Sequence, residues 1–179
     1  MTDLRTPRLH LVAITTAELL TLAEVPQPDD LFAGHGVTNP HGILTRERIP
    51  HAARIADVRA HPDHIKWYYR LIVDRASREV AGSISFHAPP DGQGMLEVGL
   101  GIAEPHRGRG LATEALRAMW TWACQQPGVA TLRYTVGTDN AASQAIIAKF
   151  PARHIGVQID EEDGPEDIYE MTVAEYLDS

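Results

Sequence analysis

The chain has 179 residues, 44% of them hydrophobic, and its 16 Lys and Arg against 24 Asp and Glu give a net charge of −8. This length and apolar content predict one domain over residues 1–179 with a single buried core. The negative charge argues against a nucleic-acid partner and favours cationic small molecules or basic peptides as partners. A lone cysteine, Cys124, excludes an internal disulfide and fits a reducing, cytoplasmic compartment. Without an apolar stretch of membrane-spanning length or a signal peptide's hydrophobic segment, we expect no membrane partner.

The first part of the chain predicts short regular segments around a long irregular one. Residues 8–13 read as a strand and residues 15–22 as a helix, capped by one of the two threonines at its start. Residues 26–42 are rich in Pro, Gly, Asp and Asn, which indicates a loop that is either a functional lid or simply mobile. A second, weaker helix is expected over residues 51–60.

From residue 67 the pattern changes to strands rich in aromatic and β-branched residues. The strands expected here are 67–74, 80–86, 95–103, 131–136, 155–159 and 168–173, and the helices are 111–123 and 141–150. Together with the earlier segments this makes about seven strands and four helices. The order predicts an α+β fold with a mixed, mainly antiparallel sheet flanked by helices.

Side chains alternate along residues 95–102 between an apolar face and an emptied face. One face carries Leu96, Val98, Leu100 and Ile102, and the other carries Met95, Glu97, Gly99 and Gly101. Glycine weakens a strand and marks a bulge, or a place where a ligand or another backbone comes close. We therefore expect a slot beside the Glu97 carboxylate. The more frequent arrangement for a single strand glutamate is an exposed residue on a solvent-facing edge.

The segment Arg107-Gly-Arg-Gly-Leu-Ala stands at the start of the helix expected at residue 111. Glycines destabilise a helix start, so their presence needs a reason. Unpaired N–H groups, the positive end of the helix dipole and missing side chains together make an anion cradle, with phosphate as the expected ligand. The segment lacks the complete P-loop and dinucleotide-binding motifs, so neither ATP nor NAD is favoured. Two neighbouring arginines are by themselves more often a solvated surface.

Three segments of the chain resemble the GNAT superfamily of acyl-CoA-dependent N-acetyltransferases, especially its RimJ/RimL-like branch of ribosomal-protein N-terminal acetyltransferases. The segment 107–112 is similar to the family's [Gln/Arg]-x-x-Gly-x-[Gly/Ala] loop, whose backbone N–H groups bind the coenzyme A pyrophosphate. The strand and turn that begin at Glu97 resemble the place where the family splays two strands to admit the pantetheine arm. Residues 138–143 are similar to the family's Asn-x-x-Ser element, and residues 6–11 to this branch's first strand.

The resemblance implies acetyl-CoA as cosubstrate, no metal, and a primary amine of a small molecule or a protein N-terminus as acceptor. It also implies two catalytic residues, Glu97 and Ser143. The residues it implies for coenzyme binding are Ile102, Arg107, Gly108, Arg109, Gly110, Leu111, Ala112, Thr113 and Asn140.

An amine is mostly protonated at neutral pH, because its pKa is about 8 for an α-amine and about 10.4 for lysine, so a base must remove a proton before it attacks a thioester. Glu97 is the candidate base, acting directly or through water, and the alternative is a carboxylate that only orients the amine. Ser143 is the candidate hydrogen-bond donor to the departing thiolate, and the alternative is an ordinary residue at a helix start.

Two positions depart from the family pattern. Ile147 stands where many members have a tyrosine general acid, so that role must pass to another group. Lys149-Phe-Pro-Ala replaces the usual Gly-Phe and alters the approach to the next strand.

Other functions compete with the transferase hypothesis. A non-catalytic acyl-CoA-binding sensor or regulatory module would keep the cradle and lose the chemistry, and a nucleic-acid binder is disfavoured by the charge. His61 and His64 have a metal-like spacing without a third ligand in a recognisable pattern, which predicts a surface loop. The sequence leaves the acceptor and the oligomeric state open, a homodimer included.

Overall fold

The computed structural model describes residues 2–25, 28, 30–45, 51–160 and 164–179. Its strands are β1 (Leu4–Arg5), β2 (Leu9–Ala13), β3 (Arg70–Asp74), β4 (Val80–Phe86), β5 (Met95–Ile102), β6 (Thr131–Gly137), β7 (Arg153–Asp160) and β8 (Gly164–Thr172). Its α-helices are α1 (Thr16–Glu24), α2 (His51–Ala60), α3 (Leu111–Ala123), α4 (Ala141–Ile147) and α5 (Val173–Leu177), and its 3₁₀ helices are Ala33–His35, Pro62–Trp67 and Glu104–His106. None of the helices in the described part of the chain has the length and apolar character of a membrane span.

The strands follow the hydrogen-bonded order β1-β2-β3-β4-β5-β6-β8-β7. The pairs β1–β2, β2–β3, β3–β4, β6–β8 and β7–β8 are antiparallel, whereas β5–β6 is parallel. The prediction of an α+β fold with a mixed, mainly antiparallel sheet is therefore confirmed. The chain divides into two compact units, residues 1–85 with 100–119 and residues 86–99 with 120–179.

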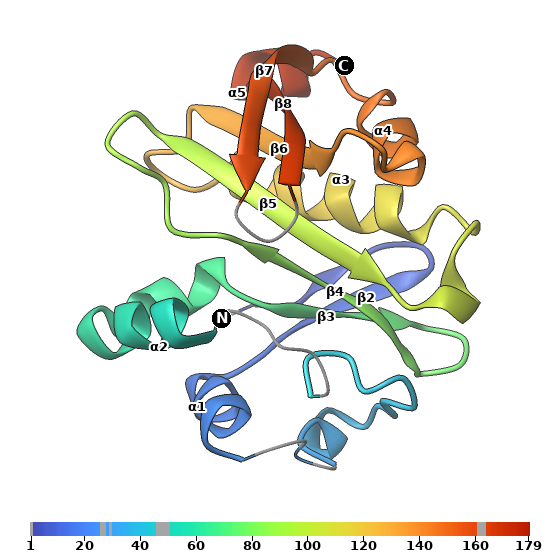
Figure 1. Cartoon of the computed structure of the whole chain (residues 1–179). Coiled ribbons are helices and arrows are strands. Elements are labelled where there is room, and N and C mark those ends of the chain that lie inside the picture. Colours follow the sequence, from blue (N-terminus) through green and yellow to red (C-terminus); the bar gives the residue numbers. More distant parts are fainter. Residues whose placement is uncertain (1, 26–27, 29, 46–50, 161–163) are drawn as a thin grey trace. The chain divides into compact units, whose positions relative to one another are not determined.

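The first unit is built around β2 and β3, which run side by side with Leu11 opposite Ile72 (Figure 1). Every residue of β3 is buried, so this strand is a central part of the core. Helix α1 begins with a capping box in which Thr15 and Glu18 bond each other's backbone N–H groups, and it packs against α2. The expected helix start is thus confirmed, with Thr15 as the N-cap.

The second unit contains the antiparallel β7–β8 hairpin, drawn in red and orange in Figure 1, and the β6–β8 pair. Its core is aromatic. The Trp120 ring lies 4.7 Å from the Phe150 ring and 5.9 Å from the Tyr176 ring, both in edge-to-face geometry. The altered sequence around Lys149 therefore keeps a buried phenylalanine that packs within this unit.

Several expected boundaries are corrected by the structure. Residues 67–69 are not part of a strand, because a 3₁₀ helix continues to Trp67 and β3 begins at Arg70. The Tyr68 hydroxyl donates to Asp57 over 2.5 Å, and these buried aromatics give the segment a strand-like composition in the sequence. Helix α4 ends at Ile147 instead of residue 150. The short β1 and α5 were not expected.

One glycine pair shows why β4 has no side chain at position 82. A Cβ built on Gly82 would overlap the carbonyl oxygen of Gly101 on β5, so the two backbones approach too closely for any side chain. The contact accounts for the glycine on β4 and not for Gly101 on β5, since a Cβ built on Gly101 would meet nothing within 4 Å.

We expect Gly82→Ala to lower the free energy of unfolding by about 1–3 kcal/mol, because the clash is with backbone that must shift. Gly34→Ala is the matched control, since its Cβ would meet nothing within 4 Å. Urea denaturation of both variants measures the effect. Equal stabilities for the two would contradict the close approach.

Candidate active site

The predicted site residues are divided between the two units. The first unit holds the loop of residues 107–110, which precedes α3, and the second unit holds Glu97 on β5 and the start of α4. Each group has its own geometry and its own set of partners.

The loop before α3 has the backbone conformation that its glycines allow. Gly108 and Gly110 have φ angles of 72° and 75°, in the left-handed region that side chains disfavour. The first intrahelical bond of α3 runs from the Glu114 N–H to the Gly110 carbonyl over 3.2 Å. The N–H groups of Gly110, Leu111 and Ala112 therefore have no acceptor within the helix. Nothing lies within 4 Å of a Cβ built on Gly108, so the loop is open to a ligand's close approach.

Both arginines of the loop are bonded to the protein itself. The Arg107 Nε donates to the Ile102 carbonyl over 2.9 Å. The Arg109 Nη2 bonds Asp74 Oδ2 over 2.8 Å, and its Nη1 lies 3.2 Å from His106 Nδ1. The cradle is consequently made chiefly of backbone donors, while the two guanidinium groups hold the loop in shape.

The Asp74 carboxylate, which bonds the Arg109 side chain of the loop, has a lowered pKa. Although its burial favours the neutral acid, hydrogen bonds from the Ala76 N–H and from Arg109 outweigh that effect and lower the pKa of Asp74 below its ordinary value. Asp74 is thus ionised at neutral pH and balances the charge of Arg109.

Glu97 projects from β5 in the second unit with a side chain that is 16% exposed. Its Oε1 accepts a hydrogen bond from the Thr135 hydroxyl over 2.5 Å and lies 3.6 Å from Nδ1 of His87. Its Oε2 has no protein partner among the described residues, which leaves one oxygen to receive a proton. The Thr135 contact fixes the orientation of the carboxylate.

The slot expected beside Glu97 is partly filled by a protein side chain. A Cβ built on Gly99 would lie 2.8 Å from Nε2 of His87, so the glycine makes room for this imidazole ring. The sequence reasoning expected the space for a ligand and did not identify His87. The side chain of His87 is 49% exposed, and it links the nearly buried carboxylate to solvent.

A row of charged residues crosses three strands near Glu97. In the strand register Arg133 on β6 is opposite both Glu97 on β5 and Glu170 on β8, so the three share one face of the sheet. The Arg133 guanidinium bonds Glu170, with its Nη2 2.6 Å and its Nε 2.8 Å from Oε1. Arg133 therefore bonds Glu170 and not Glu97 in the part of the chain that the structure describes.

Asn140 and Ser143 lie at the beginning of α4. Asn140 is the N-cap, and its Oδ1 accepts the Ser143 N–H over 3.0 Å. The Ser143 hydroxyl hydrogen bonds with Tyr134, whose pKa is raised by burial and lowered to a smaller extent by this bond. At the position of the family tyrosine, Ile147 places an apolar side chain that is 2% exposed and packs in the core. This position therefore supplies no proton donor.

The histidine pair outside the site has a local partner. His64 Nδ1 lies 2.9 Å from Asp57 Oδ2, and the rings of His61 and His64 are 4.7 Å apart. In the described part of the chain no three His, Cys, Asp or Glu side chains come together as metal ligands.

The comparisons with known proteins supply the family. Residues 8–152 match the model of a family described as the acetyltransferase (GNAT) domain. The chain therefore belongs to the GNAT family of acetyltransferases, and it is an acyltransferase. It is 26% identical over 154 residues, 86% of this chain and 84% of the relative, to YoaA of Bacillus subtilis, an uncharacterized N-acetyltransferase. A second Bacillus subtilis protein of the same description, YjdG, is 30% identical over 80 residues, 45% of this chain and 48% of that protein.

Solved structures share the fold at low sequence identity. A GNAT-family acetyltransferase from Bordetella pertussis matches 95% of this chain and 99% of its own, with a TM-score of 0.64 and 21% identity. The ribosomal-protein-S5-alanine acetyltransferase of Vibrio fischeri matches 98% and 99%, with a TM-score of 0.66 and 12% identity. RimL, a ribosomal L7/L12 α-N-protein acetyltransferase solved with coenzyme A, matches 96% and 98%, with a TM-score of 0.64 and 15% identity. The fold is thus the one used by the RimJ/RimL-like branch.

Proposed function

We propose that the protein transfers the acetyl group of acetyl-CoA to a primary amine by direct attack of the amine on the thioester. The observation that carries the proposal is the loop before α3, where two glycines in left-handed conformation precede helix N–H groups that have no acceptor within the helix. Such a loop fits a diphosphate, because several backbone donors and the helix dipole point at one anion. The complex of RimL with coenzyme A supports the same choice of acyl donor.

In this proposal the coenzyme is held mainly by backbone. Residues 107–113 and Ile102 hold the diphosphate end, and Asn140 contacts the pantetheine arm as the resemblance implies. The acyl donor supplies an activated carbonyl group, and the chain supplies orientation and proton transfer. No metal takes part in the reaction.

Glu97 removes the proton from the acceptor amine through its Oε2. The nitrogen then attacks the acetyl carbonyl carbon, loses its second proton to solvent, and the carbon–sulfur bond breaks to release the thiolate, while the proton on Glu97 also returns to solvent. Thr135 keeps the carboxylate from rotating during this exchange.

The Ser143 hydroxyl stabilises the departing thiolate by hydrogen bonding, and the proton that the thiolate finally takes comes from solvent. Tyr134 holds this hydroxyl in place, and its raised pKa makes it a poor proton donor. We expect Ser143→Ala to lower kcat about three- to tenfold, the loss that one neutral hydrogen bond gives. Steady-state kinetics at saturating acetyl-CoA measures it, with Ser83→Ala on β4 as the control. An unchanged kcat would remove Ser143 from the mechanism.

The acceptor is a cationic amine, in keeping with the net charge of −8. Protein N-termini and polyamines both belong to this class. Among the structural neighbours, RimL is named as a ribosomal-protein α-N-acetyltransferase and SpeG as a spermidine N-acetyltransferase. We propose a small amine or a basic peptide N-terminus for this chain.

A thiol-release assay tests the proposal with acetyl-CoA and a panel of polyamines, amino acids and peptides with basic N-terminal sequences. The expected result is coenzyme A release that depends on one acceptor class, with the acetylated amine identified by mass spectrometry. Binding of acetyl-CoA without turnover on any amine would favour the sensor function instead. Absence of acetyl-CoA binding would refute the whole proposal.

A further inference from the structure

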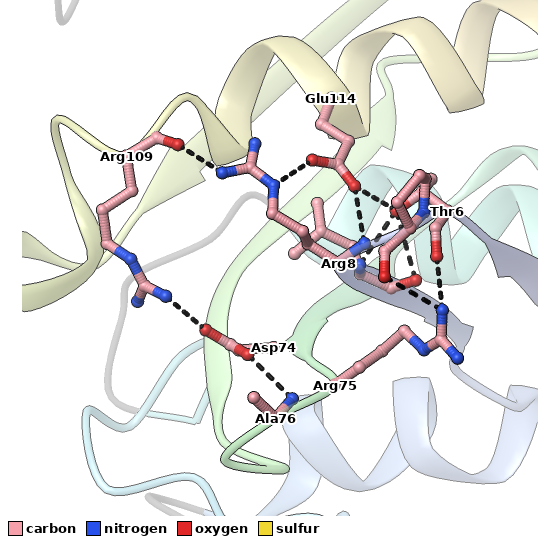
Figure 2. A network of polar contacts seen from close by, with 9 residues as sticks. Thr6, Arg8, Asp74, Arg75, Ala76, Arg109 and Glu114 are labelled. Carbon is pink, nitrogen blue, oxygen red and sulfur yellow. Dashed lines mark hydrogen bonds and ion pairs between the residues drawn. The ribbon is translucent and has the colours of Figure 1, made fainter.

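Arg8, in the turn between β1 and β2, holds the main chain of the glycine loop. The Arg8 Nη1 donates to the carbonyl oxygen of Arg109 over 2.7 Å, and this contact joins residues 101 positions apart (Figure 2). The carbonyl belongs to the peptide between Arg109 and Gly110. Within the first unit, the Arg8 side chain therefore bonds the peptide group whose N–H belongs to Gly110, the residue directly before α3.

The position of this carbonyl determines where the Gly110 N–H points. In a trans peptide the C=O and N–H bonds point in opposite directions. When Arg8 binds the carbonyl on one side, the Gly110 N–H is directed to the other. Of the two residues that this peptide joins, Gly110 lacks a Cβ, so rotation of the peptide about the Gly110 φ angle meets little steric resistance. The freedom that lets a ligand come close would also let the donor turn away, and Arg8 removes that freedom.

Arg8 is itself fixed by a carboxylate on α3. Its Nε bonds Glu114 Oε2 over 2.6 Å, and its backbone N–H bonds Glu114 Oε1 over 3.0 Å. The Thr6 hydroxyl donates to the same Oε1 over 2.5 Å. Although partial burial favours the neutral acid, the hydrogen bonds from Thr6 and Arg8 lower the pKa of Glu114, so the carboxylate is ionised at neutral pH.

A second arginine holds the turn that carries Arg8. The Arg75 Nη1 donates to the carbonyls of Thr6 and Pro7 over 2.8 and 3.0 Å. Figure 2 shows the resulting arrangement, in which Arg8 hydrogen bonds the main chain of Arg109 while Asp74 bonds the side chain of Arg109. The Arg109 residue is therefore held at its main chain by Arg8, from the turn before β2, and at its side chain by Asp74, from the end of β3.

We infer that Arg8, held by Glu114, is a positioning residue for the coenzyme: it fixes the Arg109–Gly110 peptide so that the Gly110 N–H faces the diphosphate. This inference rests on the proposed function, because it assigns the ligand of that N–H. The Arg8 charge also polarises the peptide and strengthens its N–H as a donor. Arg8 touches the loop and acts on the coenzyme only through it.

Isothermal titration of acetyl-CoA into wild type, Arg8→Ala and Arg8→Lys tests the inference. We expect the Kd to rise about tenfold in both variants, because one oriented donor is lost and lysine cannot bond Glu114 and the carbonyl in the same fork. The kcat at saturating coenzyme and the KM for the acceptor stay within about twofold. In the Arg8→Ala background, Glu114→Gln adds no further loss of affinity, since Glu114 acts through Arg8.

The control is Arg153→Ala, which breaks an exposed ion pair with Glu175 (3.2 Å) and leaves the Kd unchanged. The NMR resonance of the Gly110 amide in coenzyme-free protein gives a readout independent of activity, and we expect it to shift in both Arg8 variants and not in Arg153→Ala. Wild-type affinity in Arg8→Lys would show that charge alone matters, and a lower melting temperature with unchanged Kd would show a purely structural role. Either result overturns the inference. A wild type that binds no acetyl-CoA refutes the proposed function instead. In that case the shift of the Gly110 amide resonance still tests whether Arg8 fixes the Arg109–Gly110 peptide.

Discussion

Replacing Gly110 with tryptophan is expected to abolish acetyl-CoA binding, with a Kd raised at least about 100-fold. Two effects act together. A side chain at φ 75° costs about 1–2 kcal/mol in the left-handed region, and the indole occupies the space in front of the helix N–H groups. A Cβ at this position would itself lie only in ordinary contact with Arg8, 3.6 Å from its Nη2, so the fold can accept the change. Isothermal titration measures the loss.

The matched control is Gly128→Trp. Gly128 has a φ of 84°, and nothing lies within 4 Å of its Cβ, so the substitution imposes the same backbone strain at an exposed turn. We expect both variants to lose a similar amount of thermal stability and only Gly110→Trp to lose the coenzyme. If Gly128→Trp also failed to bind, strain would explain the loss. If both bound normally, the loop would not be the diphosphate site.

The loop was predictable from the sequence because its signal is local. Two glycines at a helix start have few explanations, and Gly108 and Gly110 do adopt positive φ angles there, whereas their use as an anion cradle stays a prediction. The alternation along β5 likewise predicted the burial of Leu96 and Val98, each 1% exposed. The alternation of apolar side chains in a strand and the backbone freedom of glycines both depend on residues that are close in the sequence. Such features can therefore be derived without a structure.

The residues that support the loop and the carboxylate could not be predicted, because their signal is not local. Arg8 and Glu114 are 106 positions apart, and His87 reaches Glu97 only because β4 and β5 pair at that level. A surface arginine and a helix glutamate are ordinary residues until the fold brings them together. Tyr68 misled the strand boundary for the same reason, since it is buried in the core of the first unit and bonds Asp57 on α2 without being part of a strand.

Glu97→Gln is expected to lower kcat about 100- to 10,000-fold at neutral pH, with acetyl-CoA binding intact. Glutamine keeps the size of the side chain and can still accept the Thr135 hydrogen bond, but it cannot take a proton. Glu166→Gln on β8 is the matched control, a half-buried strand glutamate bonded to Gln158, and we expect near wild-type turnover from it. A raised acceptor KM with unchanged kcat in Glu97→Gln would instead mean that Glu97 only orients the amine.

The pH dependence of the Glu97→Gln variant separates these roles and reports on the acceptor. Without a base, the reaction draws on amine that is already neutral, so the residual rate should rise about tenfold per pH unit below the amine pKa and level off above it. A plateau near pH 8 indicates an α-amine, and a rate still rising at pH 9.5 indicates an alkyl amine. We expect the wild type to lack this slope, because in the proposed mechanism Glu97 takes the proton in the complex. A variant whose profile parallels the wild type would place the base elsewhere.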